Sequence, residues 1–167
     1  MAIREILLYP DPGLRQIAAP VAERTPELSA LLADLAETLD ALPGCVGIAA
    51  PQVGALHRLV IVDASRYRKK VPNQGRMVLI NPTLAASSGR GMFREGCLSL
   101  PDYTANVPRA TAVTFEALDE RLEPRTVVST GFEAVVLQHE IDHLDGVLFI
   151  DRVVCVKTDL FRRQKYL

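Results

Sequence analysis

The sequence carries almost no net charge and no long apolar run. Its 167 residues hold 19 basic and 20 acidic side chains, a formal charge of -1, so the overall charge indicates neither a nucleic-acid nor a membrane partner. No segment approaches the roughly 20 apolar residues of a membrane-spanning helix. Arg4 and Glu5 interrupt the first apolar stretch, which therefore lacks the core of a signal peptide. We expect one domain, residues 1–167, in the cytoplasm, with no membrane partner and no specific DNA target.

Cysteine is also scarce. Cys45, Cys97 and Cys155 cannot all pair with one another, and their spacing forms no disulfide framework. At least one thiol is therefore free for another role. Because most free cysteines are small buried apolar residues, we assign that structural role to Cys45 and Cys155.

An amino-terminal helix is predicted between Thr25 and Pro43. Thr25 can cap the first free amides, and Pro26 suits the first helical position. An apolar stripe at helical spacing follows, formed by Leu28, Leu31, Leu32, Leu35 and Leu39.

Short strands account for much of the remaining chain. The apolar patterns predict strands at residues 58–63, 77–81, 112–119 and 122–129, the last two as a hairpin. Residues 64–76 are polar and basic, which indicates an exposed loop. We assign no regular element to residues 85–107, whose glycines permit unusual backbone angles or close approach to a ligand.

A second helix is predicted from Thr130 to Asp145. Thr130 and Glu133 have the spacing of a capping box, and Gly146 suits the left-handed end of the helix. One face carries Phe132, Val135, Val136, His139 and His143, the opposite face carries Leu137, Ile141 and Leu144, and a polar strip carries Gln138, Asp142 and Asp145. A helix that is apolar on two faces should lie in the middle of the domain.

His139 and His143 are four positions apart, so their imidazoles can converge on one metal ion. Glu140 lies between them, turned by about 100°, beside the place where such a site would hold a water. A carboxylate there can take a proton from the water and deliver it to a leaving nitrogen. Chance spacing is the alternative, but both histidines share the stripe that faces the interior, where an imidazole needs a partner.

A catalytic metal needs a third protein ligand and an open position. No His or Glu follows His143, where the chain offers only Asp145, Asp151, Asp159 and Cys155. Upstream, Cys97 lies in the segment EGCLSLP, where a glycine-flanked turn can present a thiolate. Cys97 is the leading candidate, and a thiolate with two imidazoles suits Fe(II), Zn or Co.

Three separated segments together resemble the signature motifs of the peptide deformylase family. They are GIAAPQ at residues 47–52, EGCLS at 95–99 and QHEIDHLDG at 138–146. The resemblance implies an α+β fold, with antiparallel β-sheets around a central helix that carries the HExxH motif and with an N-terminal helix. It also implies one divalent metal ion held by Cys97, His139 and His143. This ion is Fe(II) in the cell, and Zn, Ni or Co can replace it.

The resemblance further implies the reaction and its residues. The substrate is the N-formyl-methionyl end of newly synthesised polypeptides, and the products are formate and a free amino terminus. Glu140 is the acid/base, while the side chain of Gln52 and the amide of Leu98 donate hydrogen bonds to the developing oxyanion. The implied substrate-binding residues are Val46, Gly47, Ile48, Phe93, Glu95, Gly96, Phe132, Val135 and Val136.

Two positions depart from the family pattern. Cys45 stands where the first motif usually has glycine, and Arg94 stands where many relatives carry an acidic or polar residue. The carboxy-terminal segment is also short and basic, and its basic residues are Arg152, Lys157, Arg162, Arg163 and Lys165. We interpret them as a solvated tail, with a transient contact to ribosomal RNA as the alternative.

Three other functions stay open at this stage. An HExxH-type metallopeptidase would cut internal amides, a structural metal site would have four protein ligands, and an inactive deformylase homologue would keep the fold without the reaction.

Overall fold

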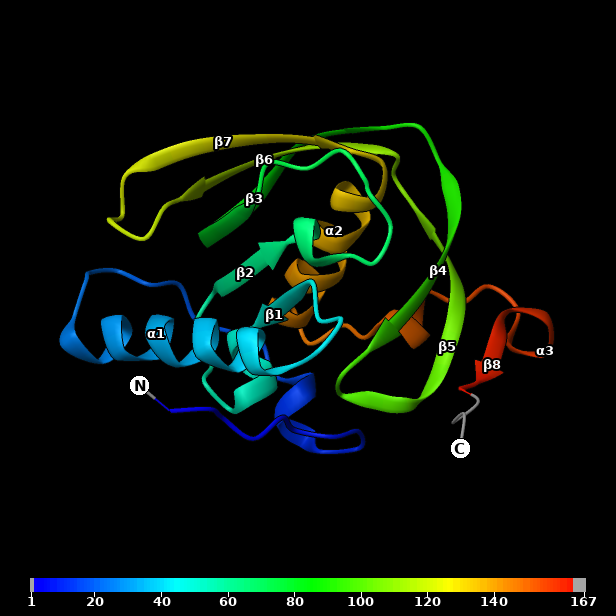
Figure 1. The fold of residues 1–167 in the computed structure, drawn as a ribbon, viewed down its shortest axis with the longest axis horizontal. Helices are drawn as coiled ribbons and strands as arrows, with labels where there is room; N and C mark the ends of the chain where they lie inside the picture. The colour runs from blue at the N-terminus through cyan, green and yellow to red at the C-terminus, as the bar shows by residue number, and fades with distance from the viewer. Residues whose placement is uncertain (1, 164–167) are drawn as a thin grey trace.

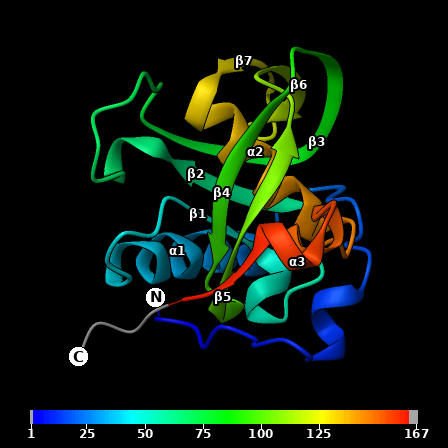
Figure 2. The ribbon, with the colours of Figure 1, turned by 90° about the vertical axis from the view of Figure 1, so that its right-hand side faces the viewer.

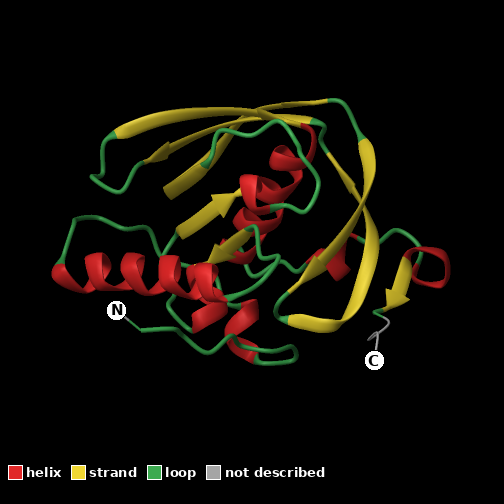
Figure 3. Cartoon of the chain, viewed as in Figure 1, coloured by secondary structure: helices red, strands yellow, loops and turns green. Residues whose placement is uncertain are grey.

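The computed structural model describes residues 2–163 and confirms the α+β fold, with antiparallel sheets around a central helix (Figures 1 and 3). The helices are α1 (Pro26–Ala41), α2 (Gly131–Leu144) and the short α3 (Val156–Asp159), with 3-10 turns η1 (Pro12–Arg15), η2 (Ala50–Val53), η3 (Ala64–Arg66) and η4 (Phe149–Arg152). The strands are β1 (Gly47–Ala49), β2 (Leu59–Asp63), β3 (Arg76–Ser88), β4 (Gly91–Cys97), β5 (Leu100–Arg109), β6 (Ala112–Leu118), β7 (Pro124–Thr130) and β8 (Leu160–Arg162).

The strands form two antiparallel sheets. One has the order β1-β2-β3-β6-β7, and the other has the order β4-β5-β8 (Figure 1). Figure 2 shows β4 and β5 side by side. All five residues of β2 are buried because the two faces of the strand pack on different helices. Val60 and Val62 share a core cluster with α2, whereas Leu59 and Ile61 share one with α1. The five-stranded sheet therefore separates the two long helices.

The first helix forms as predicted. The Oγ1 of Thr25 accepts a hydrogen bond from the amide of Leu28 at 3.1 Å, and Pro26 occupies the first turn. Four of the five predicted leucines are buried against the sheet, and Leu32 is partly buried. The cap and the apolar stripe thus fix both the start and the packing face of α1.

The strand predicted at residues 77–81 is confirmed, but strands cover more of the chain than predicted. The strand predicted at 77–81 continues to Ser88, because Asn81 and Pro82 form a bulge where the pairing with β6 shifts. A bulge allows a proline inside a strand. The segment 85–107 also forms strands, β4 and β5, after Gly89 reverses the chain at a φ of 68°.

Helix α2 packs on β1 and β2 and is buried along most of its length, as predicted. Its capping box was a wrong prediction, because the Thr130 side chain makes no cap hydrogen bond. Glu133 instead accepts hydrogen bonds from Ser129 and Gln74, which tie β7 and the loop before β3 to the helix. Gly146 has a φ of 67° at the end of the helix, as predicted.

The carboxy-terminal segment is more ordered than the predicted solvated tail. Residues 160–162 form β8, which pairs with residues 103–105 of β5. Lys165 lies outside the described residues. Among residues 2–163, no helix is long and apolar enough to cross a membrane.

Candidate metal centre

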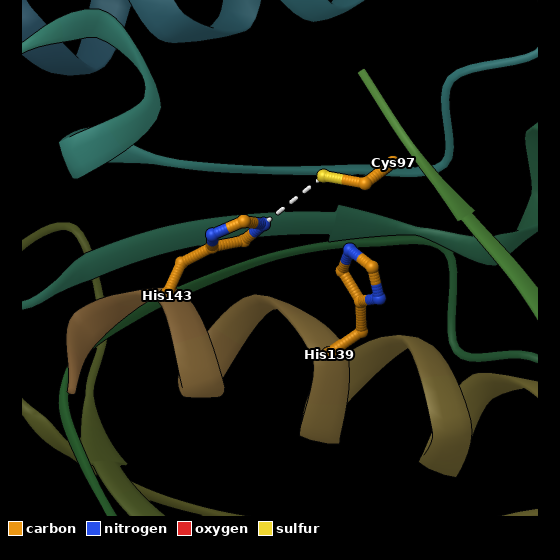
Figure 4. A group of neighbouring side chains, drawn as sticks. All are labelled: Cys97, His139 and His143. Atoms are coloured by element: carbon orange, nitrogen blue, oxygen red, sulfur yellow. Dashed lines mark hydrogen bonds between the residues drawn. The ribbon is translucent and has the colours of Figure 1, made fainter. Parts of the chain in front are cut away.

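The helix α2 presents His139 and His143 on the side that faces Cys97 (Figure 4). The Sγ of Cys97 lies 3.3 Å from Nε2 of His143, and one potential ligand atom from each of the three residues lies within 4.8 Å of the others. All three side chains are buried. Burial lowers the pKa of His143 well below its ordinary value, so its ring is neutral, as a metal ligand must be.

Cys97 reaches this point because it ends β4. Strand β4 alternates exposed and buried positions, which places Glu95 and Cys97 on the inner side and Arg94 and Gly96 on the outer side. The register with β5 shifts directly after Gly96, where the chain turns towards Leu100. The thiol of Cys97, which the sequence indicated only by the lack of other candidate ligands, thus lies against the histidine pair.

Glu95 orients one of the histidines. Its carboxylate lies 2.7 Å from Nδ1 of His139, so the Nε2 of that ring is left for a metal. Arg109 donates two hydrogen bonds to the same carboxylate, at 2.6 and 3.0 Å. Although burial opposes ionisation, Arg109 and His139 hold the pKa of Glu95 at about 2.

Arg109 joins this carboxylate to the central helix. It also donates to Asp142 at 2.6 Å, and Asp142 accepts two further hydrogen bonds from Arg152. The polar strip predicted on α2 is therefore partly an internal ion-pair network, because Asp142 is only 8% exposed. The network ties β4, β5, α2 and η4 together around the ligand set.

Glu140 is buried beside the three ligands. Within residues 2–163, its Oε2 has no hydrogen-bond partner. Burial raises the pKa of this carboxyl to about 7, against the opposing charges of His139 and Arg109. A carboxyl that titrates near neutrality can both accept and return a proton.

Gln52 has its amide fixed by the backbone. Its Oε1 accepts a hydrogen bond from the amide of Ala49 at 3.0 Å, so its Nε2 must point the other way. That nitrogen lies 3.2 Å from Oγ of Ser99 and 3.5 Å from Sγ of Cys97. The η2 turn thus directs a neutral donor towards the ligand set.

A cavity of about 500 Å³ opens onto these groups. Its lining includes Gln52, Cys97, Leu98, His139 and Glu140, together with the expected residues Val46, Gly47, Phe93, Glu95, Gly96, Phe132, Val135 and Val136. Ile48 does not line it, because its side chain is fully buried in the core beneath α1. His143 is shielded from the cavity as the innermost ligand, at 1% exposure.

The donor set fits a metal ion. A thiolate and two imidazoles, all buried and mutually close, match the ligand types of zinc and iron sites. A further ligand group is absent from the cluster formed by the described residues, which leaves room for water or substrate. A closed four-ligand structural site is therefore disfavoured.

The family model described as polypeptide deformylase matches residues 3–159. The chain belongs to the peptide deformylase family. It is 43% identical over 164 residues to the peptide deformylase of Thermodesulfovibrio yellowstonii, covering 98% of this chain and 97% of the relative. The peptide deformylase of Rhizobium meliloti is 41% identical over 166 residues, with 98% and 92% covered.

Solved structures of peptide deformylases share the fold. The enzyme from Legionella pneumophila superposes with a TM-score of 0.84 at 41% identity, covering 93% of this chain and 89% of that one. A class I type b peptide deformylase from Acinetobacter baumannii, solved with Met-Ala-Ser bound, gives a TM-score of 0.84 at 34% identity, with 91% and 99% covered. The peptide deformylases are metal-dependent amidohydrolases, and the chain is an enzyme of this class.

Several residues of this deformylase site were not singled out by the sequence. The sequence patterns did not indicate Arg109, and Ser99 appeared only as the last residue of the segment EGCLS. Tyr67, from the loop after η3, stacks on Phe132 with ring centroids 4.0 Å apart and lines the cavity. A polar and basic loop gives no sign that one of its residues will cover an apolar wall, so only the tertiary structure reveals this contact.

Proposed function

We propose that Cys97, His139 and His143 bind the one divalent metal ion with which this chain removes the N-formyl group from nascent polypeptides. The observation that supports this most directly is the group of three buried ligand atoms within 4.8 Å, next to the unpartnered buried oxygen of Glu140 and at a cavity. Fe(II) is the proposed ion in the cell, and Zn, Ni or Co would also suit the donor set. The bound ion would supply Lewis-acid polarisation of the formyl carbonyl and of a water.

Glu140 is the proposed acid/base. Its Oε2 takes a proton as water attacks the formyl carbon, and the same oxygen then returns the proton to the nitrogen that leaves as the free amino terminus. Glu140 is itself buried and shares the cavity lining with the apolar side chains of Phe132, Val135 and Val136. Burial raises the pKa of this carboxyl, which favours uptake of a proton from the attacking water.

Gln52 and Leu98 are the proposed oxyanion donors. Gln52 and Leu98 line the cavity together with the proposed ligands Cys97 and His139. Because Ala49 fixes the orientation of the Gln52 amide, the donor needs no rearrangement as charge develops on the formyl oxygen. Such preorganisation favours the transition state over the ground state.

The peptide is proposed to enter as an added strand. Strands β1 and β4 are end strands of their two sheets, and Val46 and Gly47 line the same cavity as residues of β4. Their main chains, with those of Ile48, Glu95 and Gly96, offer hydrogen-bonding groups to an extended peptide. Phe93, Phe132, Val135 and Val136 form the proposed apolar walls for the first side chain.

The single domain of residues 1–167 is proposed to act in the cytoplasm on N-formyl-methionyl chains. A transient contact with the ribosome would bring it to this substrate. The relative solved with Met-Ala-Ser bound carries a peptide that begins with methionine. This supports the proposal that the cavity of this chain binds the methionine side chain.

Formate release tests the proposal. The metal-loaded protein is incubated with formyl-Met-Ala-Ser and, separately, with unblocked Met-Ala-Ser and longer unblocked peptides. Formate from the first and no cleavage of the others is the expected result. Cleavage of internal amides would instead support the metallopeptidase, and no reaction with any peptide would support an inactive homologue.

A further inference from the structure

The carboxy-terminal strand brings a cation to the cavity. The amide of Arg163 donates to the carbonyl of Asp102 at 2.8 Å, which continues the pairing of β8 with β5 (Figure 1). The Arg163 side chain then crosses β5 and covers Gly96 of β4, where a Cβ would collide with its Nη2. Gly96 precedes the ligand Cys97, and Arg163 lines the cavity. The guanidinium group of Arg163 thus lies against Gly96, the residue that directly precedes the proposed ligand Cys97.

Arg94 adds a second cation on the same face. Arg94 and Gly96 are two residues apart and both exposed, so they share the outer side of β4. The Arg94 guanidinium lies 3.8 Å over the ring of Phe161 in β8, and its Nε donates to Asn106 at 2.9 Å. Stacking and hydrogen bonding hold this charge in place beside the cavity.

None of the ion pairs between described residues joins a carboxylate to Arg94 or to Arg163. The acidic groups of the cavity are used elsewhere, since Glu95 pairs with Arg109 and His139, and Glu140 is buried behind Gly47. Within the described residues, Arg94 and Arg163 therefore place two guanidinium groups without an ion-pair partner at the free edge of β4.

The strand geometry predicts which substrate residue meets them. A peptide added to the edge of β4 alternates its side chains between the two faces of that sheet. If the first side chain enters the inner apolar walls, the second lies on the outer face, which carries Arg94 and Gly96. The third returns to the inner side.

We propose that Arg94 and Arg163 form a specificity site that selects nascent chains with an acidic residue directly after the formylmethionine. This inference rests on the proposed function. The carboxylate of Asp or Glu at the second position accepts hydrogen bonds from the two guanidinium groups, whereas a Lys or Arg there meets like charges. The ion pair between the substrate carboxylate and the two arginines forms already in the bound ground state. The preference for an acidic residue therefore lowers KM more than it raises kcat.

The test compares formyl-Met-Asp-Ser with formyl-Met-Asn-Ser, which differ only in charge at the second position. The expected kcat/KM ratio is about threefold to fivefold in favour of Asp, the scale of a solvent-accessible ion pair, and it shrinks in high salt. The ratio falls towards one in the double variant R94Q/R163Q. The pair formyl-Met-Ala-Asp and formyl-Met-Ala-Asn shows no comparable preference, because the third side chain lies on the other face.

Arg162→Gln is the matched control. Arg162 is exposed on β8, lies opposite Tyr103 and does not line the cavity, so its loss keeps the Asp preference. Equal rates for Asp and Asn in the wild-type protein, or a preference that survives in R94Q/R163Q, would overturn this inference while leaving deformylation intact. If no formyl peptide releases formate, the proposed function fails and the specificity site fails with it.

Discussion

Gly47 shows how closely the first motif packs against the proposed acid/base. A Cβ at this position would lie 2.6 Å from Oε1 and 2.7 Å from Cγ of Glu140, well inside normal contact distances. The Glu140 carboxylate can therefore occupy this position only because residue 47 of β1 is a glycine. The neighbouring Cys45 is tolerated, because its thiol turns inward and lies 3.1 Å from the carbonyl of Gly47.

Gly47→Ala should displace the Glu140 carboxylate without removing a metal ligand. A displacement of about 1 Å in a catalytic group can cost on the order of 10²-fold in rate, and we expect a loss of that size in kcat with metal content unchanged. Gly44→Ala is the control, because a Cβ at Gly44 meets nothing within 4 Å. An alanine at this φ of 73° is strained, but it does not touch Glu140. Wild-type turnover in Gly47→Ala would contradict the packing argument.

Cys45 does not take part as a reactive thiol. Burial raises its pKa to about 12, with Glu140 adding to the shift, so the group stays protonated. Cys45→Ala should therefore keep deformylation within about twofold of wild type, since a neutral buried thiol behaves as a small apolar residue. A large loss in formate release, with the metal retained, would show that this departure from the family motif is functional.

At the scale of elements, Arg109 links four segments around the metal centre. Replacing it with Met leaves the carboxylates of Glu95 and Asp142 buried with fewer partners. Breaking a buried ion pair in this way costs about 3–5 kcal/mol, and we expect the free energy of unfolding to fall by that amount in denaturant titrations of the metal-free protein.

The matched variant is Arg125→Met. Arg125 lies on β7, and among residues 2–163 its side chain donates one hydrogen bond, to the carbonyl of Val78 at 3.4 Å, so its loss should change stability by much less. Equal effects of the two variants would mean that the buried network adds no more to stability than a peripheral contact does.

The elements differ in how far the sequence could predict them. The histidine pair and Glu140 follow from helix spacing, which is a local property of residues 139–143. Strands β4 and β5 could not be predicted, because their glycines and Pro101 weaken the local pattern and the pairing itself stabilises them. The capping box failed for a similar reason, since Ser129 and Gln74 compete for Glu133.

At the scale of the whole molecule, two of the core clusters lie on opposite faces of β2, one with residues of α2 and one with residues of α1. Leu35 of α1 is fully buried in the cluster beneath α1, whereas Leu32 is only partly buried against it. Leu35→Ala should lower the free energy of unfolding by about 2–5 kcal/mol because it opens a cavity. Leu32→Ala should cost clearly less, and similar losses in the two variants would contradict the assigned packing face.

The tertiary arrangement supplies what the sequence could not. From the residues alone, Cys97 was only the leading candidate for the third metal ligand. The resemblance to the family motif strengthened that prediction. In the folded chain the end of β4 brings its thiol against His143. The positions of Tyr67, Arg109 and Arg163 depend on contacts between distant segments, so no local pattern could reveal them.

The central claim is that Cys97, His139 and His143 hold the metal, whereas Glu140 transfers the proton. Measuring metal content together with turnover tests this claim most directly. Glu140→Ala and Cys97→Ala are purified anaerobically, and metal per chain and formate release are measured for both. We predict that Glu140→Ala keeps one metal per chain and loses about 10²–10⁴-fold in turnover, whereas Cys97→Ala loses both metal and turnover. Normal turnover in Glu140→Ala, or full metal content in Cys97→Ala, would contradict the account.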